Sequence, residues 1–357
     1  MTLKTPSSPI PGLGLEGYSD KLSVNAGEKL SLMVSGPRQH ADLNLVRLIH
    51  GDPNPKGPGY KAESVNWGHP PTLDIKQQFT DFGSYIEVPH SDSLNPTSSF
   101  TLAMWFHPTL APTGWHTLAA KWGDRFSYGL FYAGDRIITA VISHDGQSGQ
   151  WLTARETAHI DCWHFIALTY NSDTGETALY QRVGESSSQV ETRSSSSPLS
   201  KTTKRIQKGM IFSGISPLYF GAIPDPTESA QHWAHFTGKI SHPILFNEVF
   251  SETEILKVSN KRDVPNSPNV LACWDLSIGV DTSTVTDLSQ NKNHGRIVNT
   301  ADRAVTGPFW SGMPSRLYTD SPEDYNAIYF HEDDLENAGW ESACELQVAK
   351  DAKPGIY

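Results

Sequence analysis

The sequence is poor in cysteine, in basic charge and in long apolar runs. It has 3 cysteines among 357 residues, at Cys162, Cys273 and Cys344. A disulfide framework or a zinc site needs cysteines paired at short spacing, such as C-x-x-C, and no such pair occurs. Each cysteine stands among apolar or aromatic neighbours, so we expect three buried thiols in a reducing compartment.

Basic residues are scattered as well as scarce. Lys and Arg number 28 against 39 Asp and Glu, which gives a formal net charge of −11. A nucleic-acid surface needs Lys and Arg clustered opposite the phosphates. We therefore expect no nucleic-acid partner.

Long apolar segments are missing too. No stretch approaches the roughly 18 uninterrupted apolar residues that a spanning helix requires. Residues 1–20 contain no apolar segment before their prolines, so they do not have the form of a secretory signal. We expect a cytoplasmic protein with no membrane partner.

Many short alternating segments closed by turn residues are present instead. The 28 Gly and 24 Pro are typical of a loop-rich β protein. Apolar or alternating runs of strand length occur at residues 84–94, 100–108, 116–123, 127–134, 136–143, 162–171, 177–184, 217–224 and 236–246. Short strands without intervening helices predict an all-β, two-sheet sandwich of jelly-roll type. One helix is predicted at 251–257, with Ser251 as N-cap and Glu254 completing a capping box.

Four landmarks in this region resemble the laminin-G type of the concanavalin A-like sandwich, and together they span about residues 74–311. They are SYIEVPHSDSLNPTSSFTLAMWFHP, the segment CWHFIALTY, FTGKISHPILFNEVFSETEIL, and WDLS followed by DLSQNKNHGRIVN. The resemblance implies the fold but little about function, because this fold serves lectins, glycosidases and spacers alike.

The flanking segments resemble the large (beta) subunit of N,N-dimethylformamidase. They are GYSDKLSVNAGEKLSLMVS near the start and YNAIYFHEDDLENAGWESACELQVAKDAKPGIY at the end. That family hydrolyses N,N-dimethylformamide to dimethylamine and formate, with one iron held by tyrosine and glutamate in a large subunit paired with a small one. The resemblance implies amidohydrolase ancestry for this chain.

The same resemblance implies that the iron ligands lie in a C-terminal domain beyond the motif at which this sequence stops. We therefore assign no catalytic, cofactor-binding or metal-binding residue, and we expect a non-catalytic N-terminal portion of the large subunit. Its expected partners are the small subunit and the missing C-terminal half. The last residues, 353–357, have the pattern of a Pro-Gly turn that begins a strand, which suggests a fragment or one piece of a split enzyme.

The predicted organisation is a laminin-G-like sandwich inserted in an incomplete immunoglobulin-like β-sandwich. A flexible tail is expected first, and a Ser-rich mobile loop is expected inside the large sandwich. The segments are a tail at 1–17, first strands and a Gly- and Pro-rich crossing loop at 18–72, the large sandwich at 73–312 with its loop at 185–208, a linker at 313–326, and a return at 327–357. The three short strands expected in 18–50 need a partner layer, because a small sheet cannot bury both faces alone.

The segment FHEDDLENAGW is the best candidate for chemistry within the chain. Glu332, Asp334 and Glu336 have the E-x-D-x-E spacing by which some glycosidases place carboxylates on one strand face. However, Asp333 stands where such a strand needs an apolar residue, and Asn-Ala-Gly follows directly. His331 with Asp333 or Asp334 offers a metal site without a third ligand of defined spacing. A solvated turn is the favoured prediction.

A lectin-like binding module is the alternative function. Exposed Trp115, Trp122 or Trp151 at the sandwich rim would then stack on a carbohydrate or a partner protein. Other candidates are weaker, and each has a structural explanation. Packing is expected for His107, His116, His159 and His164, a hairpin turn for Ser143-His144-Asp145, a solvated loop for Lys201, Lys204, Arg205 and Lys208, and no supported calcium role for Asp92 and Asp281.

Overall fold

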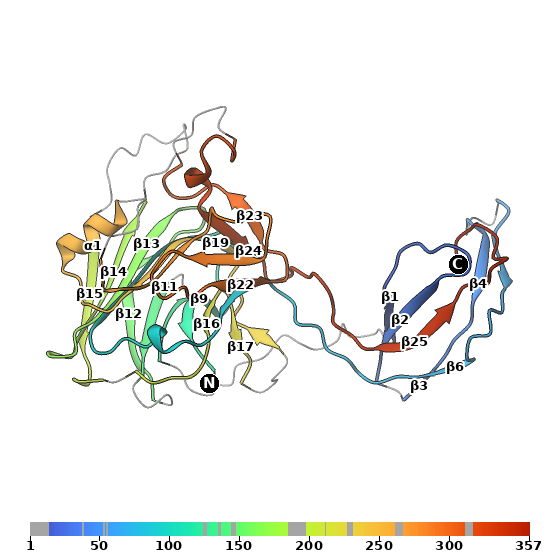
Figure 1. The fold of residues 1–357 in the computed structure, drawn as a ribbon, viewed down its shortest axis with the longest axis horizontal. Coiled ribbons are helices and arrows are strands. Elements are labelled where there is room, and N and C mark those ends of the chain that lie inside the picture. Colours follow the sequence, from blue (N-terminus) through green and yellow to red (C-terminus); the bar gives the residue numbers. More distant parts are fainter. Residues whose placement is uncertain are drawn as a thin grey trace. The chain divides into compact units, whose positions relative to one another are not determined.

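The computed structural model describes residues 14–37, 39–52, 54, 56–123, 127–134, 137–143, 148–184, 198–210, 212–226, 231–260, 267–310 and 317–357. The chain divides into two compact units, Met1–Thr80 with Ala338–Tyr357, and Asp81–Asn337 (Figure 1). Strands dominate both units, which confirms the predicted all-β class. No helix among the described residues is long and apolar enough to cross a membrane.

The smaller unit joins the two ends of the chain in one antiparallel sheet. Strand β2 lies between β1 and β25, and two further antiparallel pairs, β3 with β6 and β4 with β5, complete the unit. Their bounds are β1 (Glu16–Ser19), β2 (Lys29–Ser35), β3 (His40–Asp42), β4 (Val46–Gly51), β5 (Tyr60–Ser64), β6 (Thr72–Asp74) and β25 (Ser342–Gln347). The segment predicted as a crossing loop thus contains a strand, β5. The immunoglobulin-like assignment stays a prediction.

The larger unit is a sandwich of two antiparallel sheets, which we call the front and back sheets. The front sheet consists of β12 (Gln150–Thr157), β11 (Ile137–Ile142), β10 (Tyr128–Ala133), β9 (Trp115–Lys121), β16 (Leu218–Phe220), β7 (Tyr85–Val88), β22 (Gly295–Val298) and β21 (Thr284–Asp287). The back sheet consists of β20 (Val270–Asp275), β19 (Gly238–Phe246), β8 (Phe100–Pro108), β13 (His164–Tyr170), β14 (Glu176–Val183) and β15 (Ser200–Arg205), with β24 (Ala327–Phe330) and β23 (Asp302–Val305) beside β19.

The period-2 alternation of each strand divides its side chains between the core and an outer face. On β7, for example, Ile86 and Val88 are in the core between the sheets, whereas Tyr85 packs in a cluster on the outer face of the front sheet. A short hairpin, β17 (Ile223–Pro224) and β18 (His232–Trp233), contributes residues to that outer cluster.

The outer face of the back sheet is covered by α1 (Glu252–Ser259), which Figure 1 shows beside β14 and β15. The helix begins as predicted. The Ser251 side chain accepts a hydrogen bond from the Glu254 backbone N–H, and the Glu254 carboxylate accepts one from the Ser251 backbone N–H. Ile255 is buried against the cluster that contains Phe165 and Phe246. A local sequence signal therefore fixes the start of the one α-helix among the described residues.

Three predicted boundaries differ from the structure. Strand β24 pairs with β19 of the larger unit, so the chain leaves that unit after residue 337 rather than before 327. The predicted tail at 1–17 overlaps β1. Of the predicted loop at 185–208, residues 185–197 lie outside the described residues, whereas Ser200–Arg205 forms edge strand β15. Its Lys201 pairs with Glu176 on β14 at 3.3 Å.

Candidate functional site

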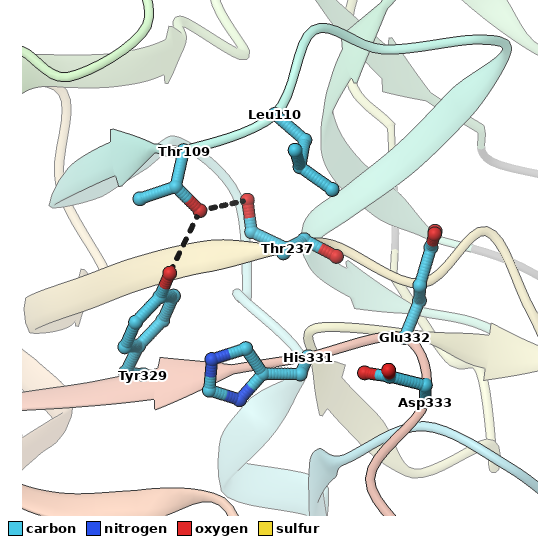
Figure 2. Close-up of a pocket in the computed structure, with 7 residues that line it drawn as sticks. All are labelled: Thr109, Leu110, Thr237, Tyr329, His331, Glu332 and Asp333. Carbon is cyan, nitrogen blue, oxygen red and sulfur yellow. Dashed lines mark hydrogen bonds between the residues drawn. The ribbon is translucent and has the colours of Figure 1, made fainter.

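The FHEDDLENAGW segment borders an open cleft of about 330 Å³ in the larger unit. Figure 2 shows the side chains that line it: Thr109, Leu110, Thr237, Tyr329, His331, Glu332 and Asp333. They come from the end of β8, the start of β19, strand β24 and the turn after it. The cleft is therefore built where three strands of the back sheet begin or end.

Strand β24 orients the aromatic part of this cleft. Its alternation buries Ile328 and Phe330 in the core and leaves Tyr329 on the outer face. The Tyr329 hydroxyl donates to Thr109 Oγ1 at 3.1 Å, and Thr109 Oγ1 in turn donates to the backbone carbonyl of Thr237 at 3.3 Å (Figure 2). The rings of Tyr329 and His331 lie with centroids 4.0 Å apart.

The carboxylates that follow lie in a turn, as predicted. Strand β24 ends at Phe330, and Glu332 and Asp333 occupy a turn with exposed side chains. Glu332, Asp334 and Glu336 do not share a strand face, so the glycosidase arrangement is not formed. Asp334 instead pairs with His331, whose Nδ1 lies 3.3 Å from Asp334 Oδ2. Residues 330–337 of the segment nevertheless belong to the larger unit, so their predicted place in the smaller one is wrong, whereas residues 338–340 belong to the smaller unit.

Tyr329 and Glu332 are of the ligand types that the resemblance implies for iron. The Tyr329 hydroxyl, however, is engaged with Thr109. Within the described part of the chain, no group of three or more His, Cys, Asp or Glu side chains is placed to share a metal ion. The cleft thus offers one tyrosine whose hydroxyl is already hydrogen-bonded, and we assign no iron ligand there.

A second polar cluster lies on the outer face of the front sheet, and no sequence motif predicts it. Asp81 accepts hydrogen bonds from the backbone of His232 at 2.7 Å and from Tyr85 at 3.3 Å, and its Oδ2 lies 2.8 Å from His232 Nδ1. The Tyr85 ring stacks on His232 with centroids 4.0 Å apart. Beyond it, His235 Nε2 bonds the His232 carbonyl, and His116 Nδ1 contacts the His235 carbonyl.

Burial and hydrogen bonding together set the protonation of this cluster. Burial acts to raise the pKa of Asp81, but hydrogen bonds and the charge of His232 outweigh it and hold the pKa below its usual value. Burial lowers the pKa of His235 to about 4 and lowers that of His116. Burial raises the pKa of Tyr85, and the nearby Asp81 charge adds to this effect. The cluster thus favours an ionised Asp81 beside neutral His235 and His116 at pH 7.

Two of the three tryptophans named from the sequence pack on one phenylalanine of the same face, and the third packs on one of these two. Trp115 lies 5.5 Å and Trp122 5.7 Å from Phe131, ring centroid to centroid, and Trp151 lies 5.2 Å from Trp115. Trp151 is 40% exposed, while Trp115 and Trp122 are partly buried. Edge-to-face packing of this kind holds large aromatic surfaces in fixed orientations. The outer face of the front sheet therefore presents a rigid aromatic platform with Trp151 at its exposed edge.

The other predicted positions have structural roles or lie outside the described residues. His164 is buried, contacts the His159 carbonyl through Nε2 and packs on Phe106, as expected of a packing histidine. His107 packs against Trp163, whereas His159 is exposed, contrary to expectation.

Asp92 is exposed near His90, with 3.6 Å between Asp92 Oδ1 and His90 Nε2, and Asp281 is exposed. His144 and Asp145 lie outside the described residues. Of the cysteines, Cys273 is buried, but Cys162 and Cys344 are only half-buried, so the prediction of three buried thiols is wrong for two.

Comparison with known proteins identifies the fold of the large sandwich. The model of the concanavalin A-like lectin/glucanases superfamily matches residues 80–256. A Bacteroides ovatus structure, provisionally assigned as a carbohydrate binding protein, aligns with 77% of this chain and 68% of its own at 16% identity and a TM-score of 0.43. The match to the family model confirms the laminin-G-like, concanavalin A-like assignment of the large sandwich.

Two relatives match almost the whole chain. The N,N-dimethylformamidase beta subunit of an Alcaligenes species is 30% identical over 363 residues, which cover 97% of this chain and 47% of that protein. The beta subunit from Paracoccus aminophilus is 29% identical over 363 residues, covering 96% of this chain and 46% of that protein. The chain thus spans less than half the length of either relative. Over nearly its whole length the chain is similar to N,N-dimethylformamidase beta subunits, and its residues 80–256 match the concanavalin A-like superfamily.

Proposed function

We propose that this chain is a non-catalytic N-terminal portion of an N,N-dimethylformamidase-like amidohydrolase large subunit. The observation that carries the proposal is the extent of the match: 97% of the chain aligns with a beta subunit, yet it accounts for 47% of that subunit. The iron-bearing catalytic residues are proposed to lie in the part of the subunit that this chain does not include. The partners are proposed to be that remainder and a small subunit.

Within such a subunit the two units described here act as scaffold and contact surface. A sandwich core packed between two sheets is rigid, and outer faces of sheets and loop ends supply contact area. Nothing in this role requires a catalytic residue in the chain.

Co-purification tests the proposal. The chain is tagged and isolated from its native source under gentle conditions, and the bound polypeptides are identified and analysed for iron. The expected result is an iron-containing complex that releases dimethylamine from N,N-dimethylformamide. Isolation of the chain alone from a lysate that retains this activity in other fractions would overturn the proposal.

A lectin-like module is the second candidate function, and one observation favours it. The platform of Trp115, Trp122, Phe131 and Trp151 offers fixed aromatic surface with one exposed edge, and sugar rings stack on such surfaces. A glycan array with the wild-type chain, Trp151→Ala and Tyr60→Ala tests it, because Tyr60 is a 65% exposed aromatic residue of the smaller unit. Selective binding that only Trp151→Ala abolishes supports this function, and binding of no glycan rejects it.

A further inference from the structure

The cleft of Figure 2 contains negative charge that the described residues do not neutralise. Glu332 and Asp333 are exposed and line the cleft, and no Lys, Arg or His among the described residues forms a salt bridge with either carboxylate. The neighbouring Asp334 differs, because it is paired with His331. Two unpaired carboxylates facing one cavity repel each other and attract a cation.

The aromatic wall of the cleft also favours a positively charged ligand. The Tyr329 and His331 rings stand together, with centroids 4.0 Å apart. The Nζ of Lys239, which does not line the cleft, already lies over the Tyr329 ring, 5.8 Å from its centroid. An ammonium group near an aromatic face is stabilised by the ring quadrupole. This tyrosine therefore already contacts one cation of the chain itself.

A buried hydroxyl adds an independent sign of a missing partner. Thr237 is only 8% exposed, lines the cleft, and its Oγ1 has no hydrogen-bond partner. Figure 2 shows this hydroxyl pointing into the space between Leu110 and Glu332. A buried polar atom without a partner is costly unless a ligand or water satisfies it. An N–H donor in the cleft would satisfy it.

We propose that this cleft binds an alkylammonium group, with Glu332 and Asp333 as counter-ions. Tyr329 and His331 form the aromatic wall, Thr237 Oγ1 accepts an N–H hydrogen bond, and the 52% exposed side chain of Leu110 contacts the alkyl chain. A neutral ligand of the same shape would leave both carboxylates without a counter-ion. The inference rests on the cleft alone and holds whether or not the chain belongs to an amidohydrolase.

Titration of the full chain with butylammonium and with butan-1-ol, followed by saturation-transfer NMR, tests the proposal. The two probes share the alkyl chain and differ in charge. Saturable binding of butylammonium is expected, with an affinity that weakens as ionic strength rises because salt screens exposed charges. Equal binding of butan-1-ol, or no saturable binding of butylammonium, would overturn the proposal.

Variants locate the bound cation. The double variant Glu332→Gln/Asp333→Asn removes both charges and should weaken butylammonium binding by up to roughly thirtyfold, since two exposed ion pairs contribute about 1 kcal/mol each at most. Glu336→Gln is the matched control, because Glu336 is exposed in the same loop but does not line the cleft. Unchanged binding in the double variant, or equal loss in the control, contradicts the site. Thermal unfolding of each variant verifies that it folds.

Discussion

His232 and Asp81 are 151 positions apart in sequence and joined twice in the structure. One carboxylate oxygen of Asp81 accepts the His232 backbone N–H at 2.7 Å, and the other lies 2.8 Å from the ring Nδ1. The pair fixes the β17–β18 hairpin against the segment that leads into β7, and Tyr85 covers it. These contacts attach the first residues of the larger unit to the outer face of its front sheet.

Replacing Asp81 by alanine should lower the free energy of unfolding by about 3 kcal/mol, because it leaves the half-buried His232 and Tyr85 donors without an acceptor. Asp74→Ala is the control. Asp74 makes a similar contact with His40 at 2.9 Å, but both side chains are largely exposed. Its loss should change stability by less than about 0.5 kcal/mol. Equal effects of the two substitutions in chemical denaturation would show that the Asp81 contacts do not stabilise the unit.

Gly83 should tolerate no side chain. It has φ +89°, and a Cβ there would stand 2.3 Å from His235 Nδ1. Gly83→Ala should destabilise by about 3 kcal/mol or more, from backbone strain and overpacking together. Gly209→Ala separates the two effects, because Gly209 has φ +62° and open space around it, so only about 1 kcal/mol is expected. Similar unfolding midpoints for the two variants would contradict the packing of His235 on Gly83.

Lowering the pH should reduce the folding stability of the larger unit already at pH values above those at which carboxylates titrate. Burial lowers the pKa of His107, His116, His164 and His235, to about 4 for the last two. Unfolded histidine binds a proton near pH 6.5, so between pH 6.5 and 4 the unfolded chain binds more protons than the folded one, and stability falls as pH falls.

The expected slope is up to about 1.4 kcal/mol per pH unit for each fully shifted histidine. Denaturant unfolding measured from pH 7 to 4.5 gives this slope. A His235→Gln variant removes one titrating group and should reduce the slope by up to about 1.4 kcal/mol per pH unit. The lowered pKa of Asp81 acts in the same direction at still lower pH. Stability that stays constant or rises over this range would disagree with buried neutral histidines.

The capping box should contribute measurably to the stability of helix α1. Ser251→Ala removes the acceptor for the Glu254 backbone and should cost about 1 kcal/mol. Thr253→Ala, an exposed change within the same first turn, should be neutral or slightly stabilising because alanine is the better helix former. Hydrogen exchange of the α1 amides measures both, and faster exchange in Thr253→Ala than in Ser251→Ala would argue against the cap.

The strands and the helix of the large sandwich were predictable where they depend on a local sequence pattern. The run FTLAMWFHP is strand β8 with the predicted bounds, and Ser251 caps α1, because alternation and capping depend on near neighbours. The edge strands β12 and β15 were missed. β15 carries mostly polar residues and borders a Ser-rich stretch, so its strand state comes from pairing with β14 rather than from its own composition.

The candidate sites depend on long-range pairing and were harder to predict. AIYF alternates equally well as a strand of either sandwich, and only its ladder with β19 places His331, Glu332 and Asp333 beside Thr109 and Thr237. Asp81 and His232 carry no motif at all, since their contact spans 151 positions. The tryptophans were identified as exposed aromatics, but the packing of Trp115 and Trp122 on Phe131 is a property of the folded front sheet.

The central claim is that this chain is the non-catalytic portion of an N,N-dimethylformamidase-like subunit. The most direct test supplies the purified chain, alone, with ferrous or ferric iron and N,N-dimethylformamide, and measures released dimethylamine and protein-bound iron. We predict release no faster than in buffer and no stoichiometric iron. Turnover by the isolated chain with one tightly bound iron per molecule would contradict it.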